Sequence, residues 1–322
     1  MDEGLEFKLT VLGSGSAMPI PQRYQSAHVL TVHGRSYLID CGEGAQRQMI
    51  RYHIPFSRID AIFISHIHGD HVFGLFGLLS TMALSGRTAP LDIYGPVALG
   101  PVLNFNKSFF GDFLSFEVRF SPLKYNSPSG DLAEPFLIRS TKALEVWAMP
   151  LNHGIDTFGY IFKEREPQMN VRRSAIEKYG LTLTEIGTLK RGEDVVREDG
   201  TPLPASEISY RPYSPRSYAY VSDTAYFDKE AQWLRGVKLL YHEATYAEEF
   251  AQKALERFHS TTLQAAAVAR DSHADTLLIG HFSSSCKDPE VYEAQARTIF
   301  PNTFALSDGQ EFSVPLDRVK LD

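Results

Sequence analysis

The sequence predicts a layered α/β fold, and three observations support this. Segments rich in β-branched and aromatic residues alternate with segments whose apolar residues recur every three or four positions. Most of the strand-like segments end near Gly, Pro or Asp, as strands do where they meet turns. The chain has 322 residues, 43% hydrophobic and 22% charged, so it can bury a sizeable core.

The expected elements follow from residue type and periodicity. Residues that favour a pleated strand predict strands at 7–12, 28–32, 37–40, 61–65, 91–94, 116–120, 136–139, 144–150, 218–222, 237–241 and 276–280. An apolar stripe at helical spacing predicts helices at 44–52, 72–84, 225–235, 247–258, 262–272 and 289–300. The last two helices have the clearest stripe.

One segment, 163–216, interrupts this alternation and is interpreted as an insertion. It is rich in charge and proline and holds little that would fill a core. Its ten Lys or Arg against nine Asp or Glu give a charge of +1, so the rest of the chain carries −8. Composition alone is equally compatible with a solvated surface excursion.

Composition and charge exclude several classes of protein. No apolar run approaches the roughly 20 residues that a membrane span needs, and the first residues, MDEGLEF, are acidic where a secretory signal is basic. A cytoplasmic location without membrane contact is therefore expected. Cys41 and Cys286 form no C-x-x-C pair, so any metal must be held by other residues. The net charge of −7 excludes nucleic-acid binding through overall basicity and requires local positive charge.

The strongest chemical signal is the segment AIFISHIHGDHVFGLFGLL at 61–79, where His66, His68, Asp70 and His71 follow an apolar strand. A strand-to-helix turn can aim His66 and His68 into one space. Asp70 and His71 would start the next helix and point toward a neighbouring position. Imidazole and carboxylate ligands without a thiolate suit zinc and, less well, iron or manganese. A lone histidine is usually structural, but this cluster predicts a metal site.

Three more candidate ligands follow apolar strands: His153 after ALEVWAMPLN, Asp223 after YAYVS and His281 after TLLIG. A closed structural zinc site has four ligands, whereas a hydrolytic pair of metals needs about seven or eight contacts and an open position for water. Each of these residues is weak evidence by itself, because polar residues at strand ends are ordinary. Together, suitable ligands at four strand ends favour a two-metal hydrolytic site.

The pattern H-x-H-x-D-H followed by isolated His, Asp and His resembles the metallo-β-lactamase superfamily. Seven stretches are similar, in order, to the motifs of the RNase Z family: LIDCGEGAQRQM (38–49), FISHIHGDHVFGLFGLL (63–79), HGIDTFGY (153–160), VSDTAY (221–226), HEAT (242–245), HST (259–261) and GHFSS (280–284). The resemblance runs from the first strand to residue 300. It implies a metallo-β-lactamase fold, a four-layer αβ/βα sandwich, as a single domain over 1–322.

The resemblance also implies roles for individual residues. One metal would be bound by His66, His68 and His153, and a second by Asp70, His71 and His281, with Asp223 bridging both. The metals would be two Zn2+ per subunit, with Mn2+ or Fe2+ as alternatives. Asp70 would accept or orient the proton of the attacking water, His259 would protonate the leaving oxygen, and Glu243 would orient His259. Substrate contacts would come from Arg23, Ser283, Lys190 and Arg191.

The implied reaction is removal of the 3′ trailer from precursor tRNA, which leaves a tRNA 3′-hydroxyl and a 5′-phosphate on the trailer. The insertion at 163–216 would be the protruding tRNA-binding arm, and GTLKRGEDV (187–195) resembles part of that arm. In the family the arm serves the substrate of the partner subunit, which implies a homodimer.

Two other functions stay open at this point. A phosphodiesterase of the same fold that acts on small phosphodiesters or esters would have the same ligand set, because fold does not determine substrate. A zinc-bound RNA-binding or scaffold protein without turnover is the second alternative. It has difficulty explaining a complete two-metal ligand set.

Overall fold

The computed structural model describes residues 5–110, 114–124 and 132–319. The chain divides into two compact units, and each is described by itself. The first unit comprises 1–163 and 217–314, and the second comprises 164–216 and 315–322.

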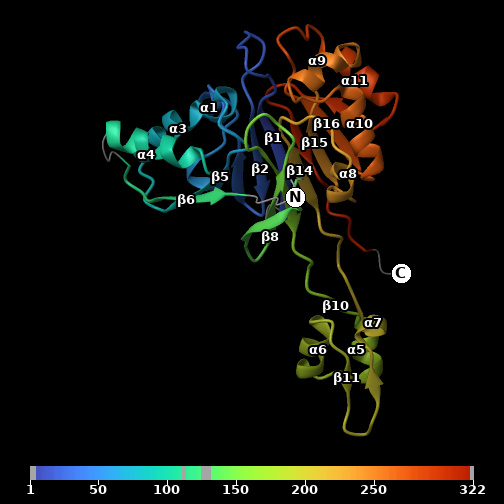
Figure 1. Cartoon of the computed structure of the whole chain (residues 1–322). Coiled ribbons are helices and arrows are strands. Elements are labelled where there is room, and N and C mark those ends of the chain that lie inside the picture. Colours follow the sequence, from blue (N-terminus) through green and yellow to red (C-terminus); the bar gives the residue numbers. More distant parts are fainter. Residues whose placement is uncertain (1–4, 111–113, 125–131, 320–322) are drawn as a thin grey trace. The chain divides into compact units, whose positions relative to one another are not determined.

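The first unit contains two seven-stranded sheets (Figure 1). The first sheet has the strand order β18 (Glu311–Ser313), β1 (Phe7–Gly13), β2 (Ala27–Val32), β3 (Arg35–Ile39), β4 (Ile59–Phe63), β5 (Leu91–Pro96) and β6 (Val118–Leu123). The second sheet has the order β17 (Thr303–Ala305), β16 (Thr276–Gly280), β15 (Leu239–Glu243), β14 (Ser217–Val221), β9 (Phe158–Glu164), β8 (Leu144–Pro150) and β7 (Phe136–Ser140).

Helices cover the outer face of each sheet. Those that follow strands of the first sheet are α1 (Ala45–Arg51), η2 (Phe56–Arg58), α2 (Gly69–Val72), α3 (Gly74–Leu84) and α4 (Leu99–Phe110). Those that follow strands of the second sheet are α8 (Glu230–Trp233), η3 (Glu248–Phe250), α9 (Ala251–Glu256), α10 (Thr262–Asp271) and α11 (Pro289–Arg297).

Side-chain alternation along the strands creates three stacked cores. In β14, Tyr218 and Tyr220 face the first sheet, whereas Ala219 and Val221 face the helices on the other side. A third cluster joins the outer face of the first sheet to α1 and α3. Because successive strand residues point to opposite faces, these three clusters account for four layers. This arrangement is the αβ/βα sandwich that the resemblance predicts.

The parallel strands of the two sheets place their carboxyl ends near one another. In the first sheet β3, β4, β5 and β6 run parallel, and in the second β14, β15, β16 and β17 do so. The carboxyl ends of parallel strands are the usual place for ligand sites in layered α/β folds. Predicted ligands follow three of these strands, β4, β14 and β16.

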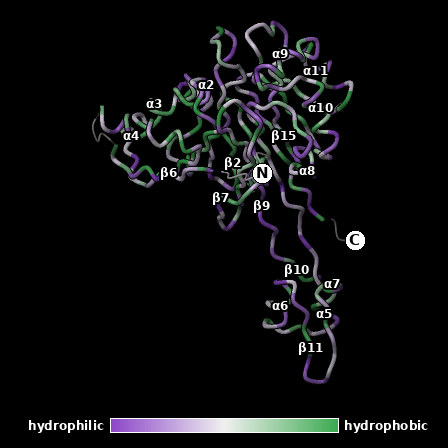
Figure 2. Tube along the Cα trace, viewed as in Figure 1, coloured by the Kyte–Doolittle hydropathy of each residue, from purple (hydrophilic) through white to green (hydrophobic). Residues whose placement is uncertain are grey.

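The second unit has its own small core, which corrects the expectation that the insertion holds little to fill one. Its elements are β10 (Asn170–Val171), α5 (Arg173–Tyr179), α6 (Leu183–Lys190), β11 (Val195–Val196), β12 (Pro202–Leu203), α7 (Ala205–Ile208) and β13 (Ser209–Tyr210). Leu181, Leu189, Leu203 and Ile208 are buried together. Figure 2 shows hydrophobic residues among the hydrophilic ones of this unit. Apolar residues spaced far apart in sequence gave no continuous stripe, although they meet once the segment folds.

The structure differs from the predicted elements in several places. The strands β9, β17 and β18 and the helix α4 are not among the predicted elements. The predicted helix 225–235 shortens to α8, and 247–258 divides into η3 and α9. The predicted helix 72–84 begins earlier and is interrupted at Phe73, between α2 and α3. No helix within the described residues is both long and apolar enough to span a bilayer.

Candidate metal centre

The seven predicted ligands lie close together in the first unit, at the ends of strands from both sheets. His66 and His68 lie in the turn after β4, and Asp70 and His71 lie in α2. The other three follow strands of the second sheet: His153 follows β8, Asp223 follows β14 and His281 follows β16. The turn after β4 is held in place because Ile64 N–H donates to Tyr94 O and Phe158 N–H donates to Ser65 O.

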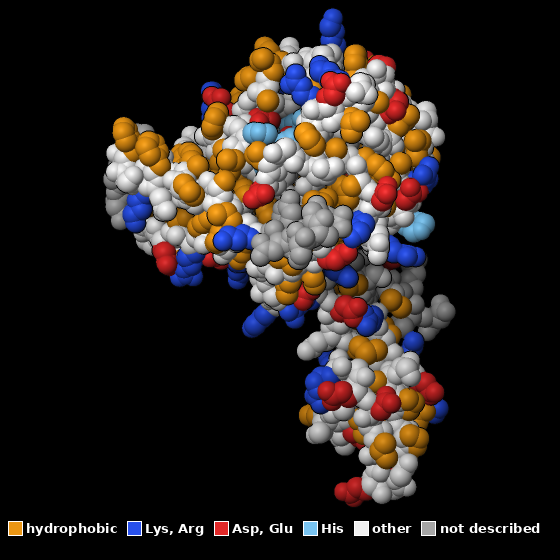
Figure 3. Space-filling model, viewed as in Figure 1, with side chains coloured by type: hydrophobic (Ala, Val, Ile, Leu, Met, Phe, Trp, Pro, Cys, Tyr) orange, Lys and Arg blue, Asp and Glu red, His pale blue; other side chains and the backbone are white. Residues whose placement is uncertain are grey.

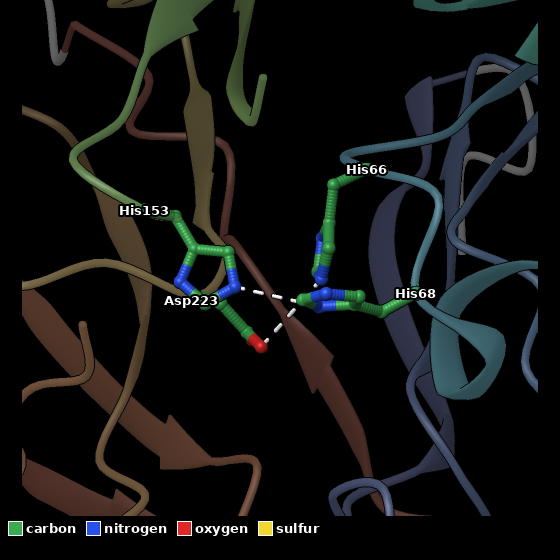
Figure 4. Close-up of side chains that lie close together, drawn as sticks. All are labelled: His66, His68, His153 and Asp223. Atoms are coloured by element: carbon green, nitrogen blue, oxygen red, sulfur yellow. Dashed lines mark hydrogen bonds and ion pairs between the residues drawn. The ribbon is translucent and has the colours of Figure 1, made fainter. Parts of the chain in front are cut away.

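Four of these residues form a first group, which Figure 4 shows: His66, His68, His153 and Asp223, whose ligand atoms all lie within 4.8 Å of one another. Nε2 of His153 is 3.4 Å from Nδ1 of His68, and Nε2 of His66 is 3.7 Å from Oδ2 of Asp223. In Figure 4 the side chains approach a common space from the two sides of the site.

The second group consists of Asp70, His71 and His281. Nε2 of His281 is 3.2 Å from Oδ2 of Asp70 and 3.3 Å from Nε2 of His71. Asp223 faces both groups. Its Oδ2 lies near His66 of the first group, and its Oδ1 lies 3.5 Å from Nε2 of His71 and 3.3 Å from Nε2 of His281. One carboxylate thus presents an oxygen to each group.

The donor set fits two divalent cations. Nitrogen and oxygen ligands about 2.0–2.2 Å from a tetrahedral ion are about 3.3–3.6 Å apart, which matches most of these separations. Nε2 of His66 and Oδ1 of Asp223 are buried and have no hydrogen-bond partner within the described residues. Buried polar atoms of this kind are rare and costly unless they bind something else. Bound cations would satisfy both atoms.

Hydrogen bonds on the far side of the imidazole rings orient several of the ligands. Nδ1 of His71 lies 2.7 Å from Oδ2 of Asp40 and is placed to donate to this carboxylate. Nδ1 of His153 likewise faces the carbonyl oxygen of Phe258 at 3.0 Å. Nδ1 of His66 faces Oγ of Ser65 at 2.9 Å. When Nδ1 carries the proton, Nε2 keeps its lone pair for a cation, which is the usual arrangement around metal-bound histidines.

The carboxylates of the centre create a demand for positive charge. Burial alone would lower the pKa of His71, but the charges of Asp70, Asp223 and Asp40 outweigh it and raise that pKa well above its usual value. Burial would raise the pKa of Asp70, but His71 and His281 outweigh burial and hold it well below its usual range. The buried carboxylates therefore favour positive charge at the centre.

His259 and Glu243 form a hydrogen-bonded pair beside the second group. Nδ1 of His259 lies 2.9 Å from Oε1 of Glu243, and Glu243 is fully buried at the end of β15. Burial alone would lower the pKa of His259, but the charges of Glu243 and Asp223 raise it to about 9. A ring nitrogen of His259 lies within 4.8 Å of ligand atoms of Asp223 and His281. The pair can therefore hold a proton at the edge of the centre.

One side of the centre is open to solvent. His68 is exposed and His153 and His259 are partly exposed, whereas His66, His71 and His281 are buried. Figure 3 shows histidine side chains, in pale blue, at the surface of this unit beside hydrophobic side chains. A large substrate could thus approach from the side of His68 while the opposite side stays sealed by protein.

The four predicted substrate-binding residues lie outside the metal groups. Nη2 of Arg23 donates to Cys286 O at 2.9 Å, and the guanidinium lies 5.4 Å from the ring centroid of Phe282. Ser283 lies two residues after His281, and its Oγ is 2.9 Å from Oγ of Ser285. In the second unit, Lys190 ends α6 and Arg191 pairs with Glu193 at 2.9 Å. Arg191 would have to leave that ion pair to reach a phosphate.

Three residues that support the centre were missed from the sequence. Asp40 accepts hydrogen bonds from Ser65 N–H at 2.7 Å, Ser65 Oγ at 2.8 Å and Tyr220 OH at 2.7 Å, besides the contact with His71. Asp40 could have been found, because it ends a predicted strand and lies within the family motif LIDCGEGAQRQM. Ser65 and Thr245 lie within the family motifs FISHIHGDHVFGLFGLL and HEAT, but nothing in the motifs marks their hydroxyls as partners of the histidines, since hydroxyl residues are common beside strands.

Comparison with known proteins decides the family. The family model described as anti-Pycsar protein Apyc1 matches residues 7–104. The ribonuclease Z of Cytophaga hutchinsonii is 39% identical over 316 residues, which cover 98% of this chain and 98% of that protein. This chain belongs to the ribonuclease Z family. The family membership predicted from the seven motifs is thereby confirmed.

Solved structures agree with this membership of the ribonuclease Z family. Human tRNase Z, short form, is similar with a TM-score of 0.69 and 27% identity, covering 96% of this chain and 99% of that chain. The metallo-β-lactamase fold protein YhfI of Bacillus subtilis has a TM-score of 0.66 at 17% identity, covering 96% of this chain and 100% of that chain. The predicted metallo-β-lactamase fold is confirmed.

Proposed function

We propose that this member of the ribonuclease Z family is a zinc-dependent endoribonuclease that removes the 3′ trailer from precursor tRNA. It would leave a 3′-hydroxyl on the tRNA and a 5′-phosphate on the trailer. The observation that carries the proposal is the convergence of seven ligand residues from both sheets into two adjoining groups that share Asp223. A single structural ion would use no more than four of them.

We assign one Zn2+ to His66, His68 and His153 and another to Asp70, His71 and His281, with Asp223 contacting both. Mn2+ or Fe2+ are alternative occupants. When bound, the two cations supply Lewis acidity and make hydroxide available near neutral pH. They also add positive charge at the centre of an acidic chain, which attracts a phosphodiester.

The protein side chains then handle the protons. Asp70 is a member of the second group and its carboxylate is kept ionised by His71 and His281, so it can accept or orient the proton of the attacking water. His259 donates Nδ1–H to Glu243, which leaves Nε2 to carry the proton that the departing 3′-oxygen requires. The buried carboxylate of Glu243 stabilises the imidazolium and fixes the direction of the ring.

A cavity at the start of α3 suits an unpaired nucleotide of the RNA. It has a volume of about 490 Å³, and Arg23, Tyr24, Arg47 and Gly74 contribute to its lining. Gly74 lies three residues after His71, at the start of α3. Two arginines and an aromatic ring offer phosphate pairing and base stacking, the two contacts that single-stranded RNA most often uses.

We propose that the segment 163–216 binds the tRNA as an arm, with Lys190 and Arg191 among its contacts. We also propose a cytoplasmic homodimer in which the arm of one subunit holds the tRNA that the other subunit cuts. Both ideas rest on the resemblance of GTLKRGEDV to part of the family's arm, and on the separate core that lets the segment fold as a compact unit.

Mapping the 3′ end of the product from a trailer-bearing tRNA transcript tests the nuclease proposal. We expect cleavage that a chelator abolishes and that added Zn2+ restores. The variant His68→Ala should be inactive, whereas His53→Asn, at an exposed histidine with a φ of 55° that Asn tolerates, should be as active as the parent. Zinc-loaded parent that leaves the transcript intact would refute the proposal.

Deleting residues 165–212 separates the tRNA role from action on small phosphodiesters. The deletion should abolish cleavage of the transcript but spare hydrolysis of a small nitrophenyl phosphodiester. Equal loss, or equal retention, of both activities would contradict the assigned role of the arm.

Mixing two inactive proteins tests the homodimer. The arm deletion and His68→Ala should together regain part of the transcript cleavage, because a mixed dimer has one intact active site facing one intact arm. Absence of any regain, with mixed dimers shown by light scattering and differential tagging, would contradict action across subunits.

A further inference from the structure

The hydroxyl of Thr245 lies between the second group of ligands and the His259–Glu243 pair. Thr245 follows β15 and is 3% exposed. Its Oγ1 is 2.8 Å from Oε2 of Glu243, 2.8 Å from Nδ1 of His281 and 3.2 Å from Nδ1 of His259. One buried oxygen thus contacts a predicted metal ligand and both members of the proton-holding pair.

The charge of Glu243 decides the direction of these hydrogen bonds. Its Oε1 accepts from Thr224 N–H at 3.1 Å and Ser260 N–H at 3.0 Å, and its Oε2 accepts from Thr245 N–H at 2.8 Å. A carboxylate surrounded by donors carries no proton of its own, and hydrogen bonds to charged groups are the stronger ones. The single hydroxyl proton of Thr245 therefore goes to Glu243.

Once that proton is committed, Oγ1 can only accept hydrogen bonds from the imidazole rings. Nδ1 of His281 must then carry a proton and donate it to Thr245. The lone pair of the neutral ring is left on Nε2, the atom that faces Asp70, His71 and Asp223. The hydroxyl thus selects the tautomer of His281 that can bind a cation.

The backbone of His281 needs this support. His281 has a φ of 58°, in the left-handed region that is disfavoured for a residue with a Cβ. The main chain of Thr245 is joined to the same segment, because Ser283 N–H donates to Thr245 O at 3.2 Å. Ala244 N–H also donates to Gly280 O at 2.9 Å. Backbone and side chain together hold an otherwise disfavoured conformation.

We propose that Thr245 is a positioning residue that fixes Nε2 of His281 toward the metal centre and joins this ligand to Glu243 and His259. The inference rests on the two-metal site of the proposed function. It goes further because it proposes that one hydroxyl fixes the positions of His281, a ligand of the second cation, and of His259, the proton donor, relative to each other.

The test compares Thr245→Val, which keeps the shape but removes the hydroxyl, with Thr245→Ser, which keeps the hydroxyl. Metal-free proteins are titrated with Zn2+ against a chromophoric chelator, without RNA. Loss of an outer hydrogen bond to a metal-bound histidine commonly weakens metal affinity about 10–100-fold. We expect Thr245→Val to lower the affinity for one of the two Zn2+ ions by that factor. The Zn2+ affinity of Thr245→Ser should stay within about threefold of that of the parent.

The variant Thr10→Val is a matched control, because Thr10 is also a buried threonine whose hydroxyl donates to a glutamate, Glu311, outside the centre. It should bind both ions as the parent does. With saturating Zn2+, Thr245→Val should lower kcat for the tRNA transcript while KM stays within twofold, since the RNA does not touch the buried hydroxyl. Circular dichroism of the metal-free proteins checks that each variant is folded.

Two results would overturn the inference. One is parental Zn2+ affinity in Thr245→Val, and the other is an equal loss in Thr245→Ser and Thr245→Val. If Thr245→Val does not fold, the comparison of Thr245→Ser with the parent still decides, because a defect in the serine variant contradicts the role of the hydroxyl. A parent that binds two Zn2+ but cuts no RNA would refute the nuclease proposal alone.

Discussion

Replacing Asp40 by Asn should destabilise the protein and loosen one metal ligand at the same time. Asp40 is fully buried and its carboxylate faces four donors, on Ser65, His71 and Tyr220. An Asn amide keeps one acceptor oxygen, so in either orientation its NH2 faces at least one buried donor. Asn also tolerates the φ of 54° at this position, so the backbone adds no separate strain.

The magnitude follows from these contacts. Losing one hydrogen bond to a charged acceptor and leaving its donor unpaired costs about 3 kcal/mol of unfolding free energy. Loss of the carboxylate beside His71 should also lower the affinity for one Zn2+ about 10–100-fold. Urea unfolding of the metal-free protein and Zn2+ titration measure the two effects. The control Asp275→Asn breaks an exposed ion pair with Lys238 and should change stability by less than about 1 kcal/mol. A change below that level in Asp40→Asn, or unchanged Zn2+ affinity, would refute the reasoning.

Three further predictions concern other contacts. The raised pKa of His259, about 9 against 6.5, means that its pairing with Glu243 stabilises the metal-free protein fully below pH 6.5 and is lost as pH rises through 9. The advantage of the parent over His259→Gln in urea unfolding should therefore disappear between those values, and a constant difference would contradict the pairing. Arg216→Ala leaves the carboxylate of Glu164 buried without its 2.7 Å partner, so unfolding free energy should fall by about 3–5 kcal/mol, whereas a loss below 1 kcal/mol would show that the pair matters little. Arg47→Ala should raise KM for the transcript without changing kcat for a nitrophenyl phosphodiester, and an unchanged KM would exclude the cavity beside Gly74 as an RNA site.

The clustering of the seven predicted ligands could be expected because strand ends are visible in a sequence. His153, Asp223 and His281 each follow an apolar run, and the parallel strands β14 and β16 bring Asp223 and His281 to one edge. The family motifs then supplied the assignment to two groups. No pattern in the sequence gives the hydrogen bonds of Ser65 or Thr245, because these depend on sub-ångström placement by neighbouring strands.

The missed elements have physical reasons too. The strands β17 and β18 have three residues each, too few for an alternation to register. The helix α4 begins with Leu99, Gly100 and Pro101, and the glycine and proline obscure its start. The core of the second unit depends on contacts between short elements, and it buries Leu189 of α6 and Leu203 of β12 in one cluster. Local periodicity carries no information about such contacts.

The distribution of the ligands along the chain affects when catalysis can begin during synthesis. The first sheet supplies His66, His68, Asp70 and His71, but the shared Asp223 and the last ligand, His281, emerge more than 150 residues later. A nascent chain that ends before residue 223 has the most recognisable motif yet lacks the carboxylate that faces both groups of predicted ligands. Both cations would therefore bind only after the two sheets have packed together. An unfinished chain would then not cleave RNA near the ribosome.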